Sequence, residues 1–256
     1  MKTRTVRMAS VTTFLILWEG ASSSALVPRY LLLGPLEIIA TLGRMLSAGE
    51  LLPHITASMG RVAIGYFLAI ISGVACGVLM GWFKIFDDIV DPIIELFRPV
   101  SPLALLPLTI LWLGIGEPSK WMVIWYGCFF PILINTYAGV RSVPKSAIEA
   151  ALTLGANTRE MLIKVIFRQS LPTMMTGARI SFSVAMIVMV AAEMINASQG
   201  LGSLILNAQQ TFRTDELYVG IVTIAVIGFM GDLLLRALKQ GICPWSISTE
   251  RTTSSK

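Results

Sequence analysis

Residues 149–172 read EAALTLGANTREMLIKVIFRQSLP and form the most polar long segment of an otherwise apolar chain. The first half predicts a short helix, because its apolar residues recur at helical spacing. Gly155 can adopt the left-handed conformation that ends a helix, and Asn157 with Glu160 three residues later is the pattern of a helix N-cap. The segment is therefore predicted to be a helix, a glycine corner and a second helix, with Pro172 at the start of the next apolar segment.

Composition indicates a membrane protein. The 256 residues are 55% hydrophobic and only 14% charged, whereas soluble domains carry about a quarter charged residues. The net charge of +5 could point to nucleic acid, but cytoplasmic loops of membrane proteins are enriched in lysine and arginine, which explains the same excess. We therefore expect an all-α, polytopic membrane protein that forms one domain over residues 1–256, with a core at about 54–240 and no nucleic-acid partner.

About six transmembrane helices are expected, because each span needs about 20 largely apolar residues. The four clearest segments are 62–83, 121–140, 173–195 and 217–235. Residues 99–116 lack charge but contain three prolines, which predicts a kinked or partly broken helix. Residues 8–24 are either a short first span or the apolar core of a signal peptide, since basic residues precede them. Gly73 and Gly77 lie four residues apart and either offer a face for close helix packing or are incidental.

The basic residues predict an orientation. Four of the 20 fall in segments on one side of the membrane, namely Arg29, Arg44, Lys120 and Arg213. Arg61 lies at the start of a span, and the remaining fifteen fall on the other side or at its edge. Because cytoplasmic segments carry the excess of lysine and arginine, we expect both termini and the 141–171 loop to face the cytoplasm.

Several ordered motifs resemble one family. Glu149-Ala150-Ala151, followed after three residues by Gly155, resembles the EAA loop of permease subunits of bacterial ABC importers. Further stretches are similar to the nitrate, sulfonate and taurine branch of these permeases; they are Leu171-Pro172, Thr176–Ile180, Ala191–Ile195, Ser198–Gly202 and Phe212–Asp215. The co-occurrence of so many ordered motifs, over roughly residues 51–238, makes the resemblance specific.

The resemblance implies a type I importer permease that moves a small anion, such as a sulfonate, taurine or nitrate, by alternating access. In that family the loop at 141–172 docks into a separate ATP-binding subunit, so the implied coupling residues are Glu149, Ala150, Ala151 and Gly155. It further implies a periplasmic or lipid-anchored substrate-binding protein, a second permease copy in a homodimer, surrounding membrane lipid, and a multi-pass location in the bacterial inner membrane.

One stripe of residues is a candidate translocation path. Arg179 and Glu193 are fourteen residues apart in the 173–195 segment, so they project from one side of a helix at a separation of about 21 Å. Ionisable groups inside a span usually face protein or water, although both could instead reach the nearer interface. The expected stripe consists of Arg179, Ser183, Met186, Val190 and Glu193. A separate face of small residues is expected to pack against another helix; it consists of Ser181, Ala185, Val188 and Ala192.

The chain shows no signature of chemistry of its own. Its three cysteines are scattered and its single histidine, His54, has no histidine or cysteine near it in sequence. No G-x-x-x-x-G-K-[ST] run is present, so nucleotide must be bound by a partner. We expect no catalytic residue, no metal site and no cofactor, and therefore not an enzyme such as an intramembrane protease.

Two alternatives remain open at this stage. A self-contained secondary carrier would place ionisable residues deep in several spans and often show an inverted repeat. The same class of permease could also carry a different small solute, such as a vitamin precursor.

The orientation can be tested with reporter fusions after Lys145 and after Thr211. They are expected to report opposite sides of the membrane, because Lys145 lies in the basic loop and Thr211 in a segment predicted to face outward. Alkaline phosphatase, active outside, and green fluorescent protein, fluorescent inside, measure the two states. Signals from the same side at both positions would contradict the six-span arrangement.

Overall fold

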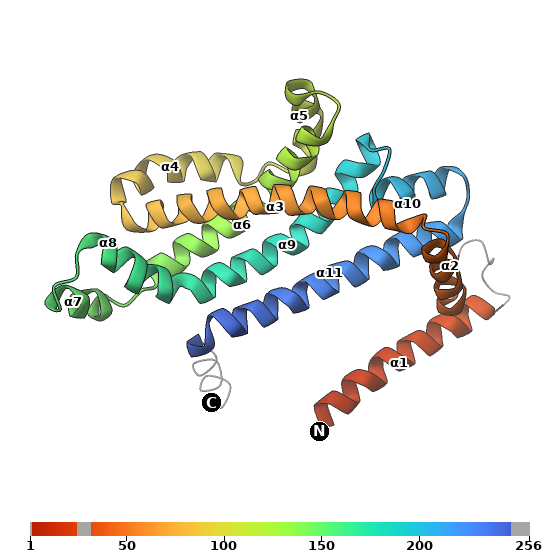
Figure 1. Cartoon of the computed structure of the whole chain (residues 1–256), viewed down its shortest axis with the longest axis horizontal. Helices are drawn as coiled ribbons and strands as arrows, with labels where there is room; N and C mark the ends of the chain where they lie inside the picture. The colour runs from red at the N-terminus through yellow and green to blue at the C-terminus, as the bar shows by residue number, and fades with distance from the viewer. Residues whose placement is uncertain (1, 25–31, 247–256) are drawn as a thin grey trace. The chain divides into compact units, whose positions relative to one another are not determined.

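The structure is a computed structural model that describes residues 2–24 and 32–246 (Figure 1). Within these ranges every regular element is helical and no strand occurs, which confirms the predicted all-α class. In chain order the elements are α1 (Lys2–Ser23), α2 (Pro35–Ser47), α3 (Leu51–Trp82), α4 (Lys84–Phe97), the 3-10 turn η1 (Pro102–Leu105), α5 (Leu106–Leu113), α6 (Glu117–Arg141), α7 (Lys145–Thr153), α8 (Thr158–Glu160), the π-helical η2 (Met161–Phe167), α9 (Arg168–Asn196), α10 (Leu201–Gln210), α11 (Thr214–Ile242) and the 3-10 turn η3 (Pro244–Ser246).

The described chain divides into two compact units. Among the described residues, unit 1 draws on 2–24, 32–59 and 193–226, and unit 2 on 60–192 and 227–246. Helices α3, α9 and α11 contribute residues to both units. The expectation of a single domain over the whole chain stays a prediction.

The membrane spans agree approximately with the predicted number. Four stretches of helix in the described ranges are long and apolar enough to cross a membrane: Leu51–Trp82, Glu117–Arg141, Thr158–Ile195 and Thr214–Ile242. A fifth span arises if α4 and the pair η1–α5 count as one, bent by 85° at the break. Residues 8–24, predicted to be either a short first span or the apolar core of a signal peptide, lie in α1 and just after it; α1 is a helix of 22 residues. This helix is not among those that are long and apolar enough to cross a membrane.

Prolines act differently at two predicted breaks. The partly broken helix predicted at 99–116 is confirmed, because only η1 and the eight-residue α5 form there, and α5 alone is too short to cross a bilayer. Pro172 was predicted to start a span, but this is wrong, since it lies inside α9. The π-helical turns of η2 give way to α-helix at Arg168, the residue whose carbonyl a proline at 172 would crowd, so the irregular backbone there accommodates the ring.

A row of glycines brings α3 against α6 in unit 2. A Cβ added at Gly77 would lie 2.7 Å from the side chain of Thr136, and one at Gly73 would lie 3.0 Å from an isoleucine of α6. Gly65 and Gly81 make equally close approaches along the same helix. The predicted packing face at Gly73 and Gly77 is therefore confirmed and extends over most of α3.

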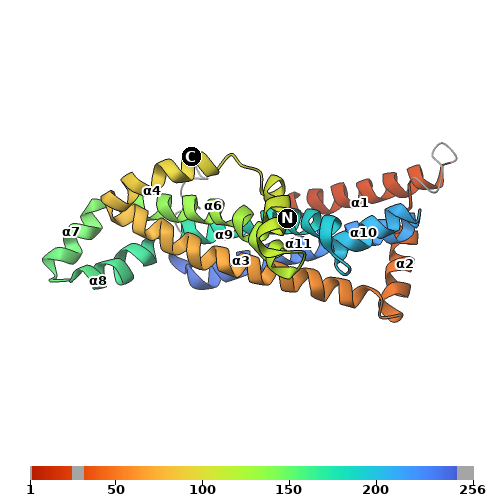
Figure 2. The same ribbon diagram turned by 90° about the horizontal axis from the view of Figure 1, so that it is seen from above.

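Helix α6 meets α9 in the same manner, so that α3, α6 and α9 lie side by side (Figures 1 and 2). A Cβ at Gly139 would lie 3.0 Å from the carbonyl oxygen of Ser170, and one at Gly177 would lie 2.5 Å from a side chain of α6. The Ser181 hydroxyl donates to the carbonyl of Cys128 over 2.8 Å. The predicted packing face of α9 is buried, as expected; its members are Ser181, Ala185, Val188 and Ala192.

Unit 1 is held together by polar contacts between its helices. The indole of Trp18 in α1 donates to the carbonyl of Leu33, just before α2, over 3.0 Å. Arg44 near the end of α2 pairs with Asp215 in the first turn of α11 over 2.8 Å. These contacts connect α1, α2 and the start of α11 into one unit.

The glycine row predicts a difference between two alanine substitutions on α3. Gly77→Ala should destabilise the protein by about 1–3 kcal/mol, because the new methyl group would meet Thr136 and the carbonyl of Leu133 at 2.7–2.8 Å. Gly60→Ala is the matched control, since nothing lies within 4 Å of a Cβ there, and it should stabilise by about 1 kcal/mol through helix propensity. Thermal unfolding in detergent measures both, and equal Tm values for the two variants would contradict the packing.

Candidate coupling and translocation sites

Helix α7 displays the Glu-Ala-Ala run at the surface of unit 2. Glu149 and Ala150 are exposed and Ala151 is half-buried, and no residue of α7 is buried. The helix begins directly after Pro144, which supplies an extended backbone at the N-cap position. Of the four predicted coupling residues, three therefore lie on an accessible helix, and the fourth, Gly155, lies just beyond its end.

Gly155 forms the predicted corner. Its φ of +78° lies in the left-handed region, which glycine adopts without the penalty that a Cβ brings. Its N–H donates to the carbonyl of Leu152 over 2.9 Å, and the N–H of Ala156 donates to that of Ala151 over 3.0 Å, so the last carbonyls of α7 are satisfied. Nothing lies within 4 Å of a Cβ at Gly155. The need for glycine there is one of backbone conformation and not of space.

The second helix begins with the predicted N-cap. The Glu160 N–H donates to Asn157 Oδ1 over 2.9 Å, and the Asn157 N–H donates to Glu160 Oε2 over 3.3 Å, so the two residues form a reciprocal capping box. Lys164 Nζ lies 2.8 Å from Glu160 Oε1, one turn further on. The helix then continues through η2 into α9, which joins the corner directly to a membrane span.

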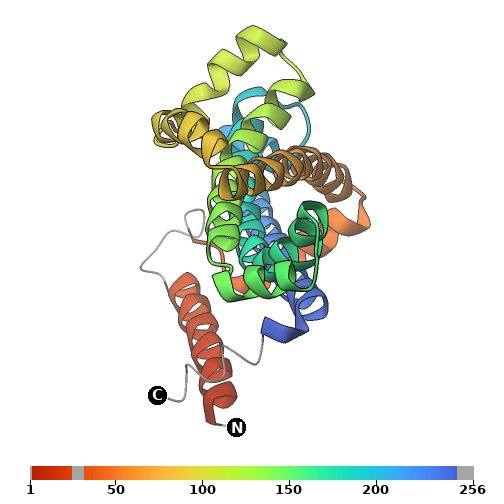
Figure 3. The same cartoon turned by 90° about the vertical axis from the view of Figure 1, so that its left-hand side faces the viewer.

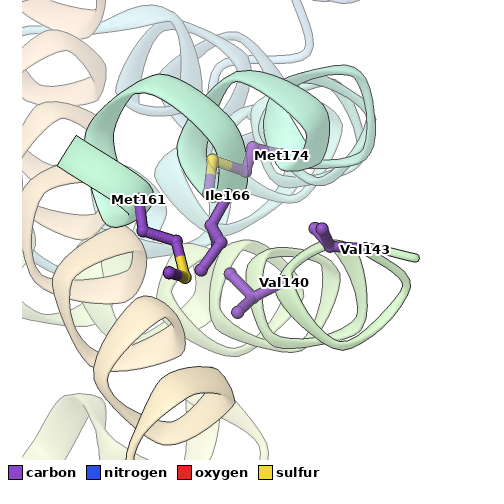
Figure 4. Packing of buried hydrophobic residues seen from close by; sticks show 5 residues of the cluster. All are labelled: Val140, Val143, Met161, Ile166 and Met174. Atoms are coloured by element: carbon purple, nitrogen blue, oxygen red, sulfur yellow. The ribbon is translucent and has the colours of Figure 1, made fainter. Parts of the chain in front are cut away.

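A buried apolar cluster anchors this segment to the span helices. Figure 4 shows its five members, which come from the end of α6, the residue before Pro144, η2 and α9: Val140, Val143, Met161, Ile166 and Met174. Partly buried side chains of α3 and Ile148 of α7 pack against it. The predicted coupling segment, which we define as residues 141–172, is thus joined to α3, α6 and α9 by close packing.

Exposed apolar side chains lie on both sides of the corner at Gly155 in the sequence. Leu152, Leu154 and Ile163 are 56%, 88% and 58% exposed, and Figure 3 views this end of unit 2 with the green α7 and α8 toward the reader. A shallow hollow beside them is lined by Asn157, Arg159, Glu160, Ile163 and Lys164. Exposed apolar groups that cluster beside polar ones mark an interaction surface. Sequence reasoning missed these three, although two leucines just before a glycine that ends a helix were a visible signal.

The predicted path residues have different environments along α9. In unit 2, Arg179 and Val190 are half-buried, Ser183 is exposed and Met186 is buried. Arg179 Nε lies 2.6 Å from Asp232 Oδ1 of α11, and Asp232 also accepts from Arg236 over 2.8 Å. Arg179 is therefore held by α11, which spacing within α9 could not reveal.

Glu193, the last residue of the predicted stripe, belongs to unit 1 and is buried. The Ser58 hydroxyl lies 2.8 and 2.9 Å from its two carboxylate oxygens, and the Gly202 N–H donates to it over 2.9 Å. Any Cβ at Gly200 would collide with this carboxylate. Glu193 thus holds the N-terminus of α10, where the N–H groups and the helix dipole favour a negative charge. Ser58 was missed, because a lone serine near a helix start carries no signal in one sequence.

A cluster of three charged side chains, Arg61, Glu117 and Lys120, joins α3 to α6 in unit 2. Arg61 binds Glu117 through two N–H groups, at 2.7 and 2.8 Å, and Lys120 Nζ lies 2.9 Å from the same carboxylate. The side chains of Arg61 and Lys120 are both buried. Such a forked arginine–carboxylate contact fixes orientation as well as charge. In the described ranges, no group of three histidine, cysteine or acidic side chains could hold a metal ion.

Comparisons with known proteins identify relatives of this chain. Residues 65–242 match the family described as "Binding-protein-dependent transport system inner membrane component". The chain is 37% identical over 248 residues to the taurine transport system permease protein TauC of Escherichia coli (strain K12), over 94% of this chain and 90% of the relative. It is 31% identical over 191 residues to the nitrate import permease protein NrtB of Synechocystis sp., over 75% of this chain and 70% of the relative.

Solved structures share the fold. An inward-facing conformation of the MetNI methionine ABC transporter aligns with a TM-score of 0.59 and 20% identity, over 73% of this chain and 95% of that chain. At this identity the likeness concerns the fold alone.

Proposed function

The chain belongs to the family of binding-protein-dependent transport system inner membrane components, and we propose that it imports a small sulfonate anion of the taurine type. It is a membrane-spanning permease subunit of an ABC importer and not an enzyme. A system of this family includes an ATP-binding subunit and a substrate-binding protein. The substrate class rests on the relatives: both the taurine and the nitrate permeases are named for small anions whose charge is spread over oxygen atoms, and the taurine relative is the more similar.

The coupling segment is the proposed contact with the ATP-binding subunit. The observation that carries this assignment is an exposed α7, ended by a left-handed Gly155 and anchored by a buried cluster to α3, α6 and α9. Glu149, Ala150 and Ala151 supply the docking surface together with the exposed leucines. Closure of the ATP-binding subunits around nucleotide then moves the coupling segments of two permease copies together and reorients the spans.

The assembly proposed around this chain follows the same logic. Two identical copies form the permease, since each needs a partner to enclose a path and the chain carries one coupling segment. Both termini and the coupling segment face the cytoplasm of a bacterium, and a periplasmic or lipid-anchored binding protein delivers the anion from the outside. Most of the basic residues fall in segments predicted to lie on one side of the membrane, and this excess supports the orientation.

The translocation path is proposed to include the stripe of α9. Ser183 and Val190 are open or half-buried in the isolated chain, whereas the neighbouring face at Ala185 and Val188 is packed against the protein. Arg179 lies in the half of α9 closer to the coupling segment, so its positive charge, although shared with Asp232, would attract an anion leaving the path. Glu193 is better suited to hold a gate than to touch an anion, because its own charge is negative.

The proposed substrate is tested by uptake in a strain that lacks the gene. Radiolabelled taurine uptake should fall to background and return with the wild-type gene, while uptake of a neutral vitamin precursor should not change. Other aliphatic sulfonates and nitrate define how selective the system is. Normal taurine uptake in the deletion strain, with loss of a neutral solute instead, would overturn the substrate class.

The coupling assignment is tested by Glu149→Lys and Gly155→Asp. Both variants should insert normally, lose taurine uptake and leave ATP hydrolysis uncoupled from transport, because one reverses a charge on the docking surface and the other adds a charged side chain at the corner. The strain of a Cβ at a φ of +78° adds about 1 kcal/mol. Glu95→Lys, an equal charge reversal at an exposed position of α4, is the control and should transport normally. Full uptake by both coupling variants would refute the assignment.

The path assignment is tested by cysteine labelling in a background without native cysteines. Ser183→Cys and Val190→Cys should react with a small water-soluble thiol reagent, with rates that change when ATP hydrolysis is trapped. Ala185→Cys and Val188→Cys should stay protected, because these positions are buried. Ile187→Cys distinguishes exposure to water from exposure to lipid. Ile187 is 68% exposed on a face of α9 other than the stripe, and a cysteine there should not react with the water-soluble reagent if that face contacts lipid. Labelling of the packed face in place of the stripe would contradict the path.

A further inference from the structure

An apolar groove with a volume of about 530 Å³ lies between α3, α9 and α11 in unit 2. Its lining on α9 extends from Phe167, just before the helix, to Ala178, and its lining on α11 extends from Leu235 to Ile242. Tyr66 of α3 lies at the Ala178 end, where its hydroxyl donates to the carbonyl of that residue over 2.8 Å. The two helices are antiparallel in this unit (Figure 1), so the other end of the groove lies between Phe167 and Ile242.

The length of the groove matches one leaflet of a bilayer. Ala178 lies eleven positions after Phe167, which corresponds to about 16 Å at 1.5 Å per residue. The hydrocarbon core is about 30 Å thick, so the groove covers about half of it. It begins at the end of α9 that joins the coupling segment. A single acyl chain that enters from that side would therefore fill the groove and reach no further than Tyr66.

Basic residues flank the open end. Arg168 follows Phe167 directly, and its guanidinium lies 5.0 Å from the ring of Trp245. Lys239 lies three residues before Ile242, which lines the open end. Its Nζ lies 3.3 Å from Thr176 Oγ1, deeper along the groove, so this side chain reaches the open end by leaving that contact. The described residues 161–178 and 233–246 contain no aspartate or glutamate. Tryptophan and basic side chains at the end of a span are typical of the membrane–water interface, and basic pockets between spans bind anionic lipid headgroups.

From the coincidence of these features we propose that the groove binds an anionic phospholipid of the leaflet on the α7 side. One acyl chain lies between α3, α9 and α11, and the phosphate lies at Arg168 at the open end, with the Lys239 side chain turned from Thr176 toward the phosphate. An apolar groove left empty would forfeit the contacts of its lining, and any lipid chain could supply them. The two basic residues are what select an anionic headgroup over a zwitterionic one.

Lipid selectivity of the full-length chain in neutral detergent tests the proposal, with native mass spectrometry as the measurement. Phosphatidylglycerol should bind about 30-fold more tightly than phosphatidylcholine with the same chains, since each basic residue near an anionic group contributes about fivefold. The double substitution Arg168→Gln with Lys239→Gln should abolish this preference and leave phosphatidylcholine binding unchanged. Lys84→Gln, which removes an exposed basic residue of α4, is the matched control and should keep the preference.

A second variant tests the groove itself. Ala75 lines the groove and is exposed, so Ala75→Trp should fill it without disturbing the fold and should lower the binding of both lipids. Glycerol phosphate, which has the headgroup chemistry but no chains, should not displace phosphatidylglycerol. Equal binding of the two lipids by the wild-type chain, displacement by glycerol phosphate, or undiminished phosphatidylglycerol binding in Ala75→Trp would overturn the proposal. Loss of self-association in Ala75→Trp with lipid binding intact would assign the groove to a second copy of the chain.

Discussion

A bilayer offers no water to an isolated charge, and this constraint accounts for the contacts that join helices distant in sequence. Arg61 of α3 meets Glu117 of α6 across 56 positions of the chain, and Arg179 of α9 meets Asp232 of α11 across 53. In each case a single carboxylate serves two cations. Once these cations are placed within a span or at its edge, the position of the acidic partner is no longer free, and the neighbouring helix is fixed with it.

The coupling segment obeys a different requirement, which is rigidity at the surface. A short helix exposed to water is only marginally stable by itself. The corner is therefore stabilised by two local features of the backbone, the left-handed Gly155 and the capping box of Asn157. The buried cluster at Val140 and Ile166 then connects the corner to the spans. In the proposed coupling role, the packed cluster would carry a movement of α7 to the spans, while the exposed residues of α7 stay accessible to a partner.

These differences explain which parts of the protein the sequence could predict. The corner at Gly155, the cap at Asn157 and the small-residue face of α9 depend on neighbours within a few positions, and all three were correctly predicted. The partners of Arg179 and Glu193 lie in other helices, so no periodicity within one segment could name them. Pro172 misled because proline is common in the first turn of a helix, which suggested that a span starts there, and the π-helical turns before it leave no signal in composition.

The site was predicted unevenly for the same reason. The exposed Glu-Ala-Ala run and its glycine were visible as a pattern, whereas the exposed Leu154 beside them becomes noticeable only when the fold shows that nothing in the described chain covers it. The stripe of α9 stays a prediction as a path, and helical spacing alone did not show that Met186 and Glu193 are buried while Ser183 is exposed. What a side chain faces depends on its surroundings, and those are set by packing.

The glycine row of α3 also bears on the order in which the chain assembles. A segment that enters a bilayer must form its helix at once, because unsatisfied backbone groups are too costly in hydrocarbon. The large backbone entropy that glycine loses on ordering is therefore spent before α3 meets α6. Glycine has no rotamers left to lose when the helices join, so the contacts at Gly73 and Gly77 form without freezing side chains on the α3 surface. Residues that would weaken a helix in water thus make its docking in the membrane entropically undemanding.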